Sequence, residues 1–154
     1  MKAMNEAQLE RPELTMERIF EAPKELVFDC WTQPEHMEKW LFPKDFAVLF
    51  SQSDIRPGGA YRSCLRAPDG ADHWVGGIYR EVRPHDRIVF THAWQDEDGN
   101  AEHETVITIT LEDIGANRTR MIFHQCFFLS AASRDGHAAG WRETFDNLES
   151  YLAA

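Results

Sequence analysis

The sequence predicts an α+β domain, in which helices are segregated from one curved, seven-stranded antiparallel sheet. Between residues 46 and 128, short segments rich in β-branched and aromatic residues are separated by compact turn signals. Pro23 and Pro34 each open a short stretch with helical spacing of apolar residues. After Ser130, apolar side chains recur at three- and four-residue steps to the chain end. Because the links between strands are short, neighbouring strands are expected to be antiparallel.

The elements follow one another in a simple order. A first strand is expected over Leu14–Glu21, where apolar and polar side chains alternate, and two short helices begin at Pro23 and Pro34. Six strands are expected next, over Phe46–Ile55, Ala60–Ala67, His73–Val82, Arg87–Gln95, His103–Asp113 and Arg118–Phe128. The final helix presents one apolar stripe, formed by His137, Trp141, Phe145, Leu148 and Leu152. A twisted sheet of this size curls, so a helix across its concave face leaves a pocket at one end.

Length and composition set the domain organisation. The 154 residues suffice for one domain with its own core. Residues 1–12 are polar and end at a proline, so we expect a flexible N-terminal extension followed by a single domain over residues 13–154. Cys30, Cys64 and Cys126 are odd in number and widely spaced, which indicates buried or inert thiols instead of a disulfide framework.

The net charge excludes several classes of partner. Acidic residues outnumber basic ones by 26 to 16, giving a formal charge of −10, which argues against binding nucleic acid or anionic membranes. No apolar run is long enough to span a bilayer, so membrane insertion is not expected. The N-terminus also lacks the apolar stretch of a signal peptide. These features together predict a cytoplasmic protein.

Strand parity selects the residues that face the pocket. From Thr105 to Leu111, the bulky apolar residues occupy odd positions, so the odd positions should face inward. Closing the preceding hairpin at residues 96–101 places His92 opposite Thr105. Closing the following hairpin at residues 114–116 places Thr105 opposite Gln125. His92, Thr105 and Gln125 would then form a polar row on an otherwise apolar face.

That row allows two interpretations. A histidine, a hydroxyl and an amide at one end of an apolar cavity could hold the carbonyl, hydroxyl or carboxylate of a ligand. Alternatively, the three side chains satisfy one another and ordered water. The candidate ligand-binding residues are Phe90, His92, Trp94, Thr105, Ile107, Phe123, Gln125, Trp141 and Phe145. No metal or cofactor is expected, because no carboxylate or thiol occupies an inward position matching His92 and His103, and His103 is expected at the rim.

Several segments resemble a known family. They include Phe20-Glu-Ala-Pro-Lys-Glu-Leu-Val-Phe28, Trp31-Thr-Gln-Pro34, Asp54-Ile-Arg-Pro-Gly-Gly59, Pro84-His-Asp-Arg-Ile-Val-Phe-Thr91 and Gly140-Trp141. In this order and spacing, over about residues 14–153, the chain resembles the START-like, or SRPBCC, helix-grip superfamily. Within it, the chain is similar to bacterial proteins related to the activator of heat-shock protein 90 ATPase. The resemblance implies a cavity between the last helix and the sheet.

Three hypotheses about function follow. The first is non-catalytic binding of a small apolar ligand in the cavity. The second is a cyclase- or hydrolase-like enzyme with His92 as general acid or base. The third is a protein-interaction module like the chaperone activator. A homodimer is compatible with each of them.

Overall fold

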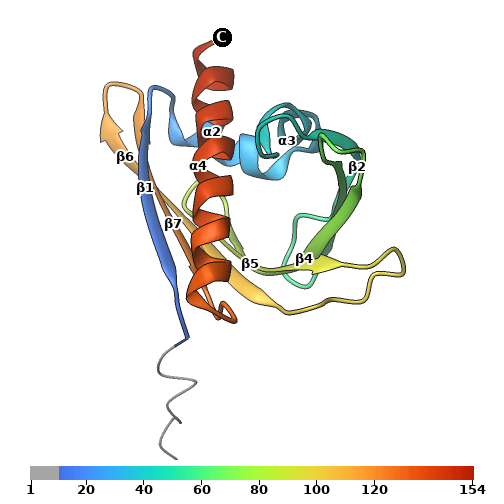
Figure 1. Ribbon diagram of the computed structural model, residues 1–154. Coiled ribbons are helices and arrows are strands. Elements are labelled where there is room, and N and C mark those ends of the chain that lie inside the picture. Colours follow the sequence, from blue (N-terminus) through green and yellow to red (C-terminus); the bar gives the residue numbers. More distant parts are fainter. Residues whose placement is uncertain (1–10) are drawn as a thin grey trace, which may run out of the picture.

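The computed structural model describes residues 11–154, so residues 1–10 of the expected N-terminal extension lie outside the described residues. The described part contains seven strands and three helices (Figure 1). The strands are β1 (Leu14–Phe20), β2 (Ala47–Ser53), β3 (Ala60–Arg66), β4 (Asp72–Arg83), β5 (Arg87–Gln95), β6 (Thr105–Gly115) and β7 (Arg118–Cys126). The helices are α2 (Lys24–Thr32), α3 (Pro34–Trp40) and α4 (Ala131–Ala153).

The strands form one antiparallel sheet in the order β1-β7-β6-β5-β4-β3-β2. The sheet curves strongly, and α4 runs across it beside β1 and β7, while α3 lies near β2 (Figure 1). This arrangement confirms the predicted α+β class, the two short helices after the first strand and the long helix over the concave face. The helix-grip architecture is therefore present.

Local sequence explains where the elements begin and end. Pro34 occupies the first turn of α3, where its missing N–H costs no hydrogen bond. The Ser130 hydroxyl caps α4 by accepting a hydrogen bond of 3.0 Å from the Ser133 amide. In the turn before β3, a Cβ on Gly59 would lie 2.0 Å from the Asp54 carbonyl oxygen, so only glycine fits there.

The pairing of β5 with β6 agrees with the prediction, since His92 is opposite Thr105 and Phe90 is opposite Ile107. The predicted pairing of β6 with β7 is wrong by two residues, because Gln125 is opposite Ile107 and not Thr105. The hairpin turns at Ala116 and Asn117, which both have positive φ, and a bulge lies just before Gly115. An even shift keeps every side chain on its predicted face.

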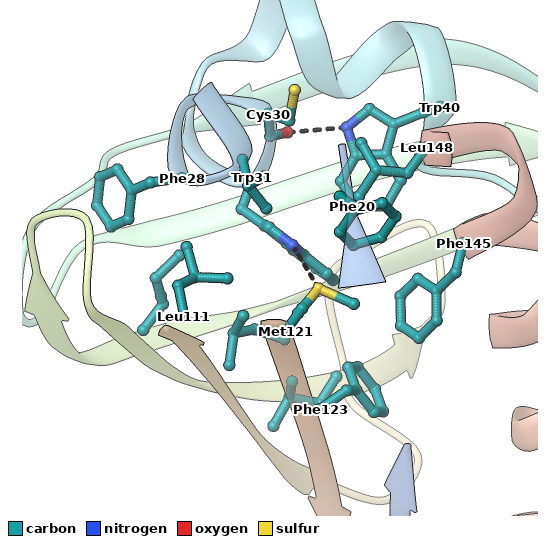
Figure 2. Close-up of a cluster of buried hydrophobic side chains, with 14 of the residues drawn as sticks. Phe20, Phe28, Cys30, Trp31, Trp40, Leu111, Met121, Phe123, Phe145 and Leu148 are labelled. Atoms are coloured by element: carbon teal, nitrogen blue, oxygen red, sulfur yellow. Dashed lines mark hydrogen bonds between the residues drawn. The ribbon is translucent and has the colours of Figure 1, made fainter. Parts of the chain in front are cut away.

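The core lies where α2, α3 and α4 meet the β1, β6 and β7 part of the sheet. Figure 2 shows its large side chains converging from these elements, including Phe20, Trp31, Trp40, Met121 and Phe145. Both buried indole N–H groups find partners: that of Trp40 donates to the Cys30 carbonyl at 2.9 Å and that of Trp31 to the Met121 sulfur at 3.3 Å. This packed half of the molecule holds α4 in place.

Candidate functional site

A cavity of about 440 Å³ opens between the N-terminal half of α4 and strands β3, β4 and β5. It therefore lies beside the packed core, on the opposite side of α4 from β1. Its walls are mainly aromatic and aliphatic, and are formed by Trp31, Met37, Leu41, Phe42, Pro43, Tyr61, Ser63, Leu65, Val75, Tyr79, Phe90, His92, Trp94, Ala132, Ser133, Gly136, His137, Gly140, Trp141 and Thr144.

The cavity exists because α4 carries small residues on the side that faces β3–β5. Ala132, Gly136 and Gly140 follow one another at four-residue spacing, which places them on one face of the helix. A Cβ added at Gly136 or Gly140 would meet no atom within 4 Å. The adjacent face carries Phe145 and Leu148, which are fully buried in the core. One helix thus closes the core with one face and leaves space with the other.

The nine predicted ligand-binding residues fall into two groups. Phe90, His92, Trp94 and Trp141 line the cavity. The other five are buried beside it: Ile107, Phe123, Gln125 and Phe145 have no exposed surface, and Thr105 is 4% exposed. These five belong to the packed layer between α4 and β6–β7, which supports the wall of this cavity, and Thr105 also lines a smaller cavity beside it.

Thr105 and Gln125 are joined in a hydrogen-bonded chain. The Gln125 amide donates to the Thr105 hydroxyl at 2.9 Å, and the Thr105 hydroxyl donates to the His92 backbone carbonyl at 2.9 Å. The Trp141 indole N–H donates to the Gln125 amide oxygen at 2.9 Å. The interpretation in which these polar groups satisfy one another therefore holds for Thr105 and Gln125. Their role is to fix the Trp141 ring against the sheet, 4.7 Å from the ring of Phe123.

The His92 side chain does not take part in this chain. Among the described residues, no hydrogen bond from its imidazole ring is found, although the residue is only 9% exposed. Burial, with a smaller effect of His137, lowers the pKa of His92 to about 3. The ring is therefore neutral at physiological pH and presents one donor and one acceptor.

His137 faces His92 from α4. The two ring centroids are 6.2 Å apart, and the His137 Nδ1 atom lies 2.8 Å from the Ser133 carbonyl oxygen. His137 was expected from sequence only as part of the apolar stripe of the last helix. Its position one turn before Trp141 was the signal that it shares the wall with Trp141.

Sequence reasoning also missed Tyr61, Tyr79 and Trp31 as parts of the cavity wall. The Tyr61 hydroxyl donates to the Thr91 carbonyl at 2.9 Å, and burial raises the pKa of both tyrosines. Of the tryptophans, only Trp94 and Trp141 would have been assigned to the pocket from sequence. The alternation of side chains along β3 and β4 could have assigned the two tyrosines to the inward face. The sheet curvature that brings those strands over α4, however, is a tertiary feature.

A smaller cavity of about 150 Å³ adjoins the first and shares His92, Trp94, Ser133 and His137 with it. His103 lines this second cavity and contacts the Phe127 carbonyl through Nε2, in agreement with the expected rim position. Within residues 11–154, no group of three or more His, Cys, Asp and Glu side chains is arranged to hold a metal ion. No described helix is long and apolar enough to cross a membrane.

The cysteines do not form a reactive site with these histidines. Cys30 is buried in α2, and burial raises the pKa of its thiol to about 11, which keeps it protonated. Burial also raises the pKa of Cys64 and Cys126. All three are free thiols, and they are absent from the walls of both cavities.

A curved antiparallel sheet gripping a long C-terminal helix around a cavity defines this chain as a helix-grip domain. The profile of the family described as activator of Hsp90 ATPase homolog 1-like protein matches residues 21–153, and the chain belongs to this family. A search of the curated proteins found no match. Membership supports a ligand-binding or interaction domain in general terms.

Solved structures agree with this assignment. A protein from Chromobacterium violaceum is 26% identical, with 91% of this chain and 96% of that chain covered and a TM-score of 0.80. A protein from Rhizobium leguminosarum is also 26% identical, with coverages of 94% and 95% and a TM-score of 0.80. The AHSA1 protein from Silicibacter pomeroyi is 24% identical, with coverages of 92% and 98% and a TM-score of 0.82, a likeness of fold.

Proposed function

We propose that this protein binds a small hydrophobic molecule in the cavity between α4 and strands β3–β5, without converting it chemically. The observation that carries the proposal is the cavity itself. Its volume of about 440 Å³ lies in the range of roughly 300–1,000 Å³ typical of small-molecule sites. Aromatic and aliphatic side chains form most of its wall, so an apolar ligand would be stabilised there by loss of water contact.

The charge of the wall indicates what kind of ligand fits. Among the described residues, the cavity wall includes no Asp, Glu, Lys or Arg. A charged ligand would lose its hydration without gaining an ion pair, which costs several kcal/mol by order of magnitude. The neutral state of His92 adds no charge. An uncharged ligand is therefore expected.

A cyclase- or hydrolase-like reaction has less support. A general base works best when its pKa is near the operating pH, whereas the pKa of His92 is lowered to about 3. The wall also offers no carboxylate to raise that pKa or to orient the imidazole.

A protein-interaction role also has less support on the outer face of the sheet. Arg120 forms ion pairs with Glu17 at 2.9 Å and with Glu112 at 3.0 Å, across the outer face of β1, β7 and β6. These charges interrupt the apolar surface on which a partner protein would dock. The interior cavity is thus the stronger candidate for function.

The first experiment is native mass spectrometry of the purified protein, followed by denaturing extraction and identification of any released compound. A co-purified neutral apolar compound supports the proposal. If the protein is purified without a ligand, the neutral fluorescent probe N-phenyl-1-naphthylamine is titrated against it. Absence of both a co-purified ligand and saturable probe binding contradicts the proposal.

The cavity is then tested directly with Gly140→Leu, which directs a side chain into the open space beside Gly140. Ala139→Leu is the matched control, because Ala139 is exposed on the same helix. Ligand or probe binding should be lost in Gly140→Leu and unchanged in Ala139→Leu, while thermal unfolding shows both variants folded. Equal binding by the two variants would place the ligand elsewhere.

A further inference from the structure

The cavity contains two neighbouring imidazole rings with unused hydrogen-bonding capacity. No hydrogen bond from the His92 ring is found among residues 11–154, and this largely buried residue lines both cavities. Buried polar groups in proteins are almost always paired with protein, water or ligand. An apolar wall with an unpaired polar group therefore indicates where a ligand's own polar group would lie.

The hydrogen bond of His137 determines what the second ring can offer. Its Nδ1 atom is 2.8 Å from the Ser133 carbonyl oxygen. Since a carbonyl oxygen only accepts, Nδ1 must carry the hydrogen, and the tautomer is assigned on that basis. In the neutral ring, Nε2 is then an acceptor, and His137 lines both cavities. The ligand group beside it must donate a hydrogen bond.

His92 offers the complementary function. A neutral imidazole has one N–H, so His92 can donate to the same ligand atom that donates to His137. The ring centroids are 6.2 Å apart, so one oxygen atom can bridge the facing nitrogens of the two rings with two hydrogen bonds of about 2.8 Å. A hydroxyl group donates and accepts at once, whereas a carbonyl or an ether only accepts and would leave His137 Nε2 unpaired.

Flat aromatic side chains surround this pair. The His92 ring lies 5.9 Å from the Trp141 ring and 6.2 Å from the Trp94 ring. Phe90 is two residues before His92 on the same face of β5 and also lines the cavity. Aromatic faces and edges at such separations favour a flat aromatic guest.

We infer that the ligand is an uncharged aromatic compound bearing a hydroxyl group, which bridges His92 and His137 while its rings lie among Phe90, Trp94 and Trp141. This inference rests on the proposed function, because it names the class of molecule that the same cavity takes. The absence of cationic and anionic side chains from the described cavity wall makes carboxylates and amines poor ligands.

Four probes of similar shape test the inference: 2-naphthol, 2-methoxynaphthalene, naphthalene and 2-naphthoate. Dissociation constants are measured with the intact protein by tryptophan fluorescence and calorimetry. Because one good hydrogen bond contributes about 0.5–1.5 kcal/mol, 2-naphthol should bind roughly threefold to tenfold more tightly than 2-methoxynaphthalene, whose oxygen cannot donate. The 2-naphthoate anion should bind most weakly.

The role of the two histidines is tested by substitution. His137→Phe and His92→Phe should each bind 2-naphthol and 2-methoxynaphthalene about equally, while His137→Gln, whose amide oxygen can accept, should keep part of the preference. His124→Phe is the matched control on the outer face of β7, and should retain the full preference. Circular dichroism and thermal unfolding confirm that each variant is folded.

The outcomes separate the two proposals. Equal affinity of the native protein for 2-naphthol and 2-methoxynaphthalene overturns the hydroxyl inference and leaves a hydrophobic container. A preference that survives in both His137→Phe and His92→Phe overturns the assignment to these residues. Failure of all four probes to bind while N-phenyl-1-naphthylamine or a co-purified ligand still binds overturns the inference alone, whereas absence of any binding overturns the proposed function as well.

Discussion

Acid sensitivity of the fold tests the burial of His92 most directly. The pKa of His92 is about 3 in the folded protein, against about 6.5 for histidine in an unfolded chain. Between these values the unfolded chain binds a proton that the folded protein does not. The free energy of unfolding must therefore fall as the pH drops below the unfolded value, by up to about 1.4 kcal/mol per pH unit.

The magnitude follows from the two pKa values. Between about pH 7 and about pH 5, the proton taken up by the unfolded chain should lower the free energy of unfolding by about 2 kcal/mol through His92. His92→Gln removes the titrating ring and keeps a polar side chain. The variant should consequently lose about 2 kcal/mol less stability than the native protein over this interval.

The assay is urea unfolding, monitored by circular dichroism, at a series of pH values between about 5 and about 7. Other groups titrate too, so the informative quantity is the difference between the native protein and His92→Gln at each pH. His124→Gln, on the outer face of β7, is the control and should keep the native acid sensitivity. Parallel pH profiles for the native protein and His92→Gln would show that burial does not lower the pKa of His92 in the folded protein.

Three further predictions concern stability and are checked by urea unfolding at neutral pH. Phe145→Ala should lower the free energy of unfolding by about 3–5 kcal/mol, because Phe145 is fully buried. Trp141→Ala should lower it by less, because Trp141 faces the cavity. The reverse order would mean that the faces of α4 are misassigned. Gln125→Met should lower the free energy of unfolding by about 1–3 kcal/mol, because it leaves the Trp141 indole N–H without an acceptor and removes the donor to the Thr105 hydroxyl, which keeps its own bond to the His92 carbonyl; a neutral result would contradict the hydrogen-bonded chain. Gly136→Ala should stabilise α4 by about 0.5–1 kcal/mol, since an added Cβ meets open space, and destabilisation would show that the space is filled.

Much of the site was predictable because side-chain direction in a strand depends on parity alone. Phe90, His92 and Trp94 alternate along β5, so all three were assigned to one face, and that face lines the cavity. The pairing of His92 with Thr105 was also correct. The assignment of Gln125 opposite Thr105 failed because the positive φ of Ala116 and the bulge before Gly115 are not encoded in an apolar pattern.

The position of the empty space could not be obtained in this way. Ile107 and Phe123 share the inward face of the sheet with Phe90, and Phe145 faces them from α4, yet all three are buried in the core. Which inward residues touch a ligand depends on where α4 crosses the sheet, and that crossing follows from packing against α3 and β1. The proximity of His137 to His92 also depends on where α4 crosses the sheet, so it could not be predicted from the sequence.

The alternation of apolar residues, Pro23 before α2, Pro34 at the start of α3 and the apolar stripe of α4 are local properties. For that reason the amino-acid order alone established the elements and their inward faces. Sheet curvature, the register of the last hairpin and the position of α4 on the sheet arise from contacts between residues far apart in the chain. Those long-range contacts placed the cavity beside β3–β5 and turned His92 and His137 toward each other. A linear pattern specifies which way a side chain points, whereas packing specifies what it meets.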